Sequence, residues 1–144
     1  MASKLFSSFE LRTLALKNRI VVSPMCQYSA NDGVASDWHM AHVPTMAMSG
    51  AGLTMIEMTD VEPIGRITLG CLGLYSDACE AALQRVVQSA KRWGGAVIGV
   101  QLAHAGRKGS THKPWEGGAP LRPQEGAWQT VAPSAIPFAD GWPA

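Results

Sequence analysis

Two side chains with acid–base and thiol chemistry follow directly after an apolar run near the start of the chain. The run at residues 20–22 is β-branched and ends at Ser23-Pro24, which is typical of a buried strand. Cys26 and Tyr28 come next, and they offer a tunable thiol and a phenolic proton donor. Ligands of parallel α/β folds bind at the carboxyl ends of strands. The spacing alone fits a ligand site and an ordinary turn with a buried cysteine equally well.

A second polar group lies at the end of another apolar run, which spans residues 96–102. The amide of Gln101 can form paired hydrogen bonds with the edge of a heterocycle. His104 follows, and the cations Arg107 and Lys108 suit an anionic ligand. A solvated loop would explain both cations equally well, but it does not readily explain Gln101 at the end of an apolar strand.

Two other patterns resemble site motifs but lack the context that those motifs need. His39 and His42 are three residues apart, with no acidic or cysteine partner at a telling spacing. We therefore expect helix capping or packing from them and no metal site. Gly50-Ala51-Gly52 comes after a helix and before a strand, the reverse of a dinucleotide-binding fingerprint, so we expect it to shape the turn.

The elements that must position these groups alternate along the chain. The hydrophobic periodicity predicts strands at 20–22, 53–58 and 96–102, helices at 37–49 and 78–93, and a long loop at 60–75. Asp77 and Glu80 resemble a capping box for the second helix, which buries a face that includes Leu83 and Val86. Pro44 predicts that the first helix is kinked or begins late.

Near-continuous apolar strands joined by helices indicate a parallel α/β sheet covered by helices. An open doubly wound sheet and a (β/α)₈ barrel both satisfy this pattern, and three strands complete neither. Residues 106–144 have no periodicity and are rich in Gly, Pro and Trp. So long an irregular stretch is more natural as a functional loop of a larger domain.

Composition places the chain among globular proteins and excludes several classes. Its 144 residues are 47% hydrophobic and 16% charged, with a formal net charge of +1, which excludes disorder and argues against a nucleic-acid binder. The spacing of the three cysteines, Cys26, Cys71 and Cys79, forms no C-x-x-C motif. A disulfide framework or zinc knuckle is therefore not expected. No signal sequence or membrane span stands out, and we predict a cytoplasmic protein.

Four stretches, in order, carry a family resemblance. Residues 16–28, LKNRIVVSPMCQY, resemble the opening of the old yellow enzyme family of flavin-dependent ene-reductases. EPIGRIT at 62–68, QLAHAGRK at 101–108 and APSAI at 132–136 follow in the family order. Cys26, together with KPWEG at 113–117, resembles the subclass that contains the bacterial xenobiotic reductases and the thermophilic-like enzymes. The match covers essentially the whole chain.

The resemblance implies a TIM barrel with FMN at its carboxyl rim. The implied reaction is an ene-reduction, in which NAD(P)H reduces FMN and the flavin passes hydride to an activated C=C bond, as in an enone. Residues 1–144 would be the N-terminal segment of this single domain, about three βα units, with 106–144 as a long loop on the active-site side. A complementary C-terminal polypeptide would complete the barrel, and the assembled enzyme could form a homo-oligomer. The alternative is a non-catalytic flavin-binding fragment, or the interaction half of a split protein.

The resemblance also assigns roles to individual residues. The residues implied to line the flavin are Ser23, Pro24, Met25, Cys26, Met58 and Gln101. Cys26 would tune the flavin potential, Gln101 would bind the pyrimidine edge, and Tyr28 would give the substrate a hydrogen bond or proton. Met58 stands where relatives usually carry alanine. The family's substrate-binding histidine pair and its phosphate-binding loops have no counterpart within residues 1–144.

Overall fold

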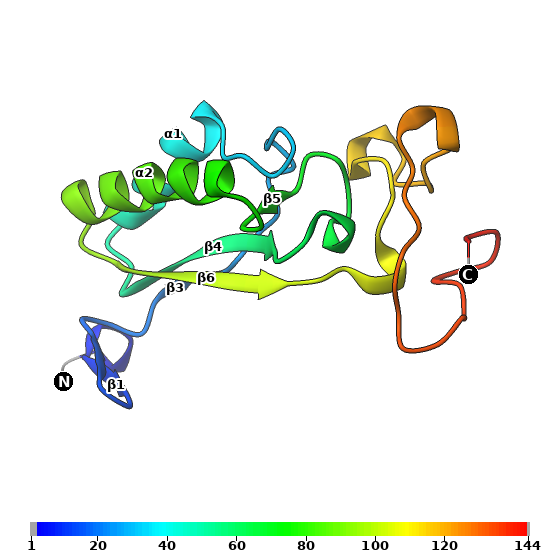
Figure 1. Cartoon of the computed structure of the whole chain (residues 1–144). Helices are drawn as coiled ribbons and strands as arrows, with labels where there is room; N and C mark the ends of the chain where they lie inside the picture. Colours follow the sequence, from blue (N-terminus) through cyan, green and yellow to red (C-terminus); the bar gives the residue numbers. More distant parts are fainter. Residues whose placement is uncertain (1–2, 144) are drawn as a thin grey trace.

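The computed structural model describes residues 3–143 and shows a parallel sheet with two helices on one face (Figure 1). The sheet consists of β3 (Val21–Val22), β4 (Leu53–Asp60), β5 (Leu72–Gly73) and β6 (Val97–Ala103). The helices are α1 (Asp37–Met48) and α2 (Asp77–Trp93). The predicted order of strands and helices is confirmed.

Strand β4 is the centre of the sheet, and every pairing to it is parallel. Val21 of β3 lies opposite Leu53 on one side, and Val97 of β6 lies opposite Leu53 on the other. The short β5 pairs with the carboxyl end of β4. Within residues 3–143, β6 pairs with β4 alone, so its other edge has no strand beside it. Leu102 on β6 is 58% exposed, which marks this edge as an uncovered part of the fold.

The two helices pack against each other and against the sheet, and their contact forms the core. Predicted face residues Leu83 and Val86 of α2 are buried, together with Val43 and Ala47 of α1. Ile56 of β4 completes this cluster from the sheet. The amphipathic pattern of the second helix therefore identified its buried side correctly.

One helix start agrees with the prediction, and the other differs in detail. Helix α1 begins at Asp37 behind the N-cap Ser36 and continues through the buried Pro44, so the alternative of a late start is wrong. The cap sets the start here, and the proline costs the helix one internal hydrogen bond without ending it. Helix α2 is capped by Ser76, whose hydroxyl accepts from the N–H of Cys79 at 3.2 Å. Asp77 is therefore the first helical residue and not the cap.

Two short pieces of β structure were not predicted. Asp60 belongs to β4 and the residues of β5 form a strand, so the stretch 60–75 is not wholly loop. A two-residue strand is too short to show an alternating pattern, and only its pairing with Thr59–Asp60 creates it. The antiparallel hairpin of β1 (Phe9–Leu11) and β2 (Leu14–Leu16) lies near the amino ends of the sheet strands (Figure 1).

The stretch after β6 is irregular, as predicted, and extends beyond the carboxyl ends of β4 and β6 (Figure 1). Up to residue 143 its helical elements are 3-10 turns, at Gly106–Lys108, Pro114–Glu116 and Pro123–Glu125. Thr111 connects it to the rest of the chain through its bridge with Thr68. Among residues 3–143, no helix has both the length and the apolar character to cross a membrane.

The Gly50-Ala51-Gly52 turn joins α1 to β4, as its position predicted. A Cβ atom at Gly52 would lie 2.5 Å from the carbonyl oxygen of Asn18, so the close approach of two backbones requires glycine there. The side chain of Asn18 donates to the carbonyl of Gly50 at 2.8 Å and holds the same turn. These glycines therefore serve the connection into the central strand.

Candidate active site

The carboxyl ends of β3, β4 and β6 bring together four of the predicted site residues. The thiol of Cys26, in the segment after β3, interacts with the backbone of Met58 and with the hydroxyl of Tyr28. Met58 in turn lies opposite Gln101 in the β4–β6 ladder. Residues separated by up to 75 positions in the chain thus share one edge of the sheet.

The environment of Cys26 keeps its thiol protonated. Burial, with smaller contributions from the nearby Cys71 and Glu57, raises the pKa of Cys26 to about 11, against the opposing interactions with Tyr28 and Met58. A thiol with such a pKa carries very little thiolate at neutral pH. The side chain is therefore suited to contact as a polarisable neutral group and not to attack as a nucleophile.

Tyr28 is also held in its protonated form. Burial and the neighbouring Cys26 raise the pKa of its hydroxyl to about 12. Its backbone has φ +51°, which is unfavourable for a residue with a side chain, and its ring makes an edge contact with Trp115 at 5.7 Å between centroids. The phenol is thus a fixed hydrogen-bond donor beside the thiol.

Gln27, between these two residues, is held by contacts with β4 and α1. Its backbone N–H donates to Oε2 of Glu57 at 2.8 Å, and its side-chain oxygen accepts from Nε1 of Trp38 at 2.9 Å. Glu57 is 4% exposed to solvent and lies at the position where the β4–β6 register shifts. Sequence reasoning missed Glu57, because an acid inside an apolar strand shows no partner in the sequence.

The two histidines of α1 have the structural roles that the sequence favoured. Nδ1 of His39 accepts from the backbone N–H of Ser36 at 3.0 Å and so caps the helix. His42 stacks on Trp38 with 5.9 Å between ring centroids. No cluster of three or more His, Cys, Asp or Glu side chains within residues 3–143 could hold a metal ion.

The other predicted residues lie on the same rim. Ser23 and Met25 are exposed and Pro24 is half-buried. Gln101 is exposed, and its amide has no hydrogen-bond partner among residues 3–143. A primary amide left free at the end of an apolar strand is available for an external ligand.

The polar residues after β6 are tied to the surrounding loops. Nε2 of His104 lies 2.9 Å from Oε1 of Glu62, and a guanidinium nitrogen of Arg107 donates to Oγ of Ser134 at 3.0 Å. The ammonium group of Lys108 lies 5.9 Å from the ring centre of Phe138. These contacts link parts of the long irregular stretch to one another and to the loop after β4.

Asp60, the last residue of β4, is a second acid that the sequence reasoning missed. It is 0% exposed, and neither carboxyl oxygen has a hydrogen-bond partner within the described part of the chain. Burial raises its pKa to about 7, against the attraction of Arg66 and with the repulsion of Glu57. The only sequence signal was an acid ending an apolar strand, and exposure there would have been the ordinary expectation.

Comparison with known proteins gives this arrangement a family. The profile of the NADH:flavin oxidoreductase / NADH oxidase family matches residues 4–132. An NADPH dehydrogenase of Listeria monocytogenes is 46% identical over 138 residues, and the match covers 94% of this chain and 36% of the relative. An NADPH dehydrogenase of Geobacillus thermodenitrificans is 42% identical over 145 residues, covering 99% of this chain and 38% of the relative.

Solved structures agree with the sequence relatives. Morphinone reductase superposes with a TM-score of 0.76 at 29% identity, covering 96% of this chain and 33% of that chain. An old yellow enzyme from Pichia sp. AKU4542 has a TM-score of 0.76 at 26% identity, covering 95% and 33%. This chain thus spans about a third of the length of the relatives that it matches.

These matches decide between the two folds that the strand pattern allowed. The structural neighbours are TIM barrels, and the parallel sheet with its two helices is the N-terminal part of such a barrel. The predicted resemblance and fold class are confirmed. The chain belongs to the NADH:flavin oxidoreductase / NADH oxidase family, the family of the old yellow enzymes.

Proposed function

We propose that this chain supplies the N-terminal part of the active site of an FMN-dependent ene-reductase that uses NAD(P)H and reduces activated C=C bonds, as in enones. One observation carries the proposal. Cys26, Tyr28, Met58 and Gln101 lie together at the carboxyl edge of the sheet, where ligands of TIM barrels bind. Membership of the flavin oxidoreductase family supports the same reaction class.

The residues at this edge fit a flavin. The Gln101 amide, without a partner among residues 3–143, offers one donor and one acceptor, which matches the alternating polar edge of a pyrimidine ring. Met25 and Cys26 provide polarisable sulfur atoms for an aromatic ring system, and the backbone of 23–26 is the adjoining wall. The bulkier Met58 narrows the space beside Gln101. Bound FMN would supply hydride transfer between NAD(P)H and the alkene.

The chain's own contribution to the reaction is positioning and proton supply. Tyr28 keeps its proton at neutral pH and presents it from a fixed ring, so it would protonate or hydrogen-bond the substrate. The neutral thiol of Cys26 would adjust the electronic environment of the flavin without reacting. Residues 106–144 would form the active-site-side loop that covers the substrate.

We further propose that a complementary part of the barrel supplies the remaining strands. The unpaired edge of β6, with Val100 and Leu102 exposed, offers the pairing surface for the next barrel strand. The share of the relatives covered by this chain supports the same division. Residues 1–144 then form one segment of a single barrel domain.

Production of this chain with and without the complementary segment of a relative's barrel tests the proposal. Native mass spectrometry should show the two polypeptides and FMN in one particle, and that particle should oxidise NAD(P)H in the presence of an enone. A stable monomer of this chain that binds FMN tightly by itself would contradict the division of the barrel. An assembly that binds FMN without turnover would support the alternative of a non-catalytic flavin-binding protein.

A further inference from the structure

Gln27 is held from three directions at the point where the segment carries its two chemically active side chains. Besides the contacts to Glu57 and Trp38, its side-chain amide donates to the carbonyl of Met25 at 2.8 Å. Gln27 is the residue between Cys26 and Tyr28 in the chain. Whatever fixes Gln27 therefore limits where the thiol and the phenol can lie.

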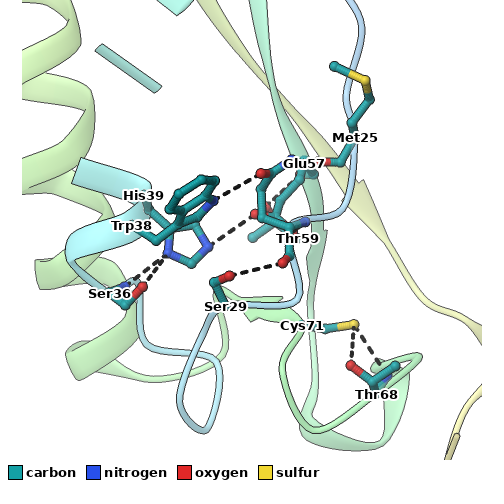
Figure 2. A network of polar contacts seen from close by, with 10 residues as sticks. Met25, Ser29, Ser36, Trp38, His39, Glu57, Thr59, Thr68 and Cys71 are labelled. Carbon is teal, nitrogen blue, oxygen red and sulfur yellow. Dashed lines mark hydrogen bonds and ion pairs between the residues drawn. The ribbon is translucent and has the colours of Figure 1, made fainter. Parts of the chain in front are cut away.

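The contact with Glu57 is part of a buried chain of polar groups that leads into α1 (Figure 2). Oε1 of Glu57 lies 3.0 Å from Nε2 of His39, and the two side chains are 3% and 1% exposed. The backbone N–H of Ser36 donates to Nδ1 of His39, so Nδ1 carries the lone pair and the proton of the neutral ring is on Nε2. Nε2 thus lies against the carboxylate at ion-pair distance, without the alignment of a hydrogen bond within the described residues.

Two physical costs show that this arrangement needs support. A carboxylate removed from water requires partners, and Glu57 has them in the Gln27 N–H and the His39 ring. Tyr28 has a backbone conformation, φ +51°, that persists only where the surroundings hold it. The clamp on Gln27 lies one residue before that strained position.

We infer that Glu57 and His39 are positioning residues for the flavin-site segment: the buried pair fixes the main chain at Gln27 and thereby places Cys26 and Tyr28 at the carboxyl edge of the sheet. Only the consequence of this positioning for catalysis rests on the proposed function. The clamp itself is a property of the folded chain. It links the start of α1 to the site through an acid in the central strand.

The reactivity of Cys26 reports on the clamp, because Cys71 and Cys79 are buried and Cys26 is the more accessible thiol. In the assembled protein, alkylation of Cys26 by iodoacetamide should be several-fold faster in Glu57→Gln, because Glu57 helps to raise the pKa of the thiol and its loss increases the thiolate fraction. The rise of the rate with pH should also begin at lower pH. Peptide mapping by mass spectrometry measures both.

A second variant separates positioning from charge. His39→Gln leaves the carboxylate of Glu57 in place but removes the ring that caps Ser36 and faces Oε1. A purely electrostatic effect of Glu57 would leave the alkylation rate unchanged in this variant, whereas loss of positioning accelerates it several-fold. Glu62→Gln is the matched control, because it removes a carboxylate from the more exposed His104 pair and should change the rate less than about twofold.

The wild-type protein provides a test that needs no variant. The backbone amide of Gln27 should exchange its hydrogen as slowly as the backbone amides of β4, because its acceptor is the buried carboxylate of Glu57. Exchange at the rate of an open loop, or unchanged alkylation in both variants, would overturn the inference. Absence of FMN binding or turnover in the wild-type assembly would instead contradict the proposed function, and the exchange result would still decide the clamp.

Discussion

Met58 of β4 lies directly opposite Gln101 of β6, one residue beyond the point where the register of the two strands shifts at Glu57. Ile56 pairs with Val100 before the shift, so an unbroken ladder would have placed Glu57 opposite Gln101. The extra residue turns the acid out of the ladder and leaves it free to hold Gln27. The register shift in β4 thus places Met58 opposite Gln101 and also places Glu57 where it holds Gln27.

Replacing Met58 by Ala tests its proposed contact with the flavin. The smaller side chain should widen the space beside Gln101, so we expect the assembled protein to bind FMN about threefold more tightly, which corresponds to about 0.6 kcal/mol. Fluorescence titration of FMN measures the dissociation constant. Met48→Ala, at an exposed position on α1, is the control. Equal affinity of M58A and wild type would place Met58 away from the bound ring.

Replacing Tyr28 by Phe tests the proton donor. The ring and its contact with Trp115 remain while the hydroxyl is lost, so alkene reduction should slow by about 10²-fold, the lower range for general acid catalysis. Reduction of the flavin by NAD(P)H should change much less. Stopped-flow absorbance separates the two half-reactions, and equal slowing of both would exclude Tyr28 as the donor.

Asp60 predicts a dependence of stability on pH. Its pKa in the folded protein is about 7, above its ordinary value of 3.8, so the native state binds more protons than the unfolded state between these values. The free energy of unfolding contributed by this group therefore falls as the pH rises through that window. Asp60→Asn stays neutral, so its stability should match the wild type near pH 4 and exceed it at pH 8.

Urea unfolding at both pH values measures this difference. The same exchange at the exposed Asp140 is the control and should give no such trend. A parallel pH dependence in D60N and wild type would mean that Asp60 is not the group responsible.

The cap of α2 predicts a defined loss of stability. Ser76→Ala removes the acceptor of the Cys79 N–H and should lower the free energy of unfolding by about 1 kcal/mol. Ser89→Ala, inside the same helix, should instead change it by a few tenths in the favourable direction. Denaturant unfolding followed by circular dichroism compares the two, and similar effects would contradict the capping role.

The exposed edge of β6 predicts where a complementary polypeptide would pair. Leu102→Lys places a charge on a side chain that a neighbouring strand and helix layer would cover, so assembly should weaken by at least about tenfold. Native mass spectrometry over a concentration series measures the assembly. The control is Leu5→Lys, at an exposed position outside the sheet. An equal loss of assembly in both variants would argue against pairing at β6.

Much of the fold followed from local patterns. The apolar run at 53–58 and the amphipathic face with Leu83 and Val86 each reflect the surroundings of a single element, so periodicity was sufficient to identify them. The same holds for Cys26 and Tyr28, whose place after a strand located the candidate site. The hairpin of β1 and β2 lacked such a signal, since Phe9 and Leu11 are exposed in the structure.

The sequence by itself determined the order of the main strands and helices, the parallel sheet and the segment of the candidate site, because these depend on neighbours along the chain. Only the tertiary structure decided the register shift at Glu57, the pairing of Glu57 with His39 and the burial of Asp60. Each of these depends on how strands and helices distant in sequence meet, and a shift of one residue would change every contact. The chemistry at the sheet edge is encoded locally, but the packing of the fold sets its geometry.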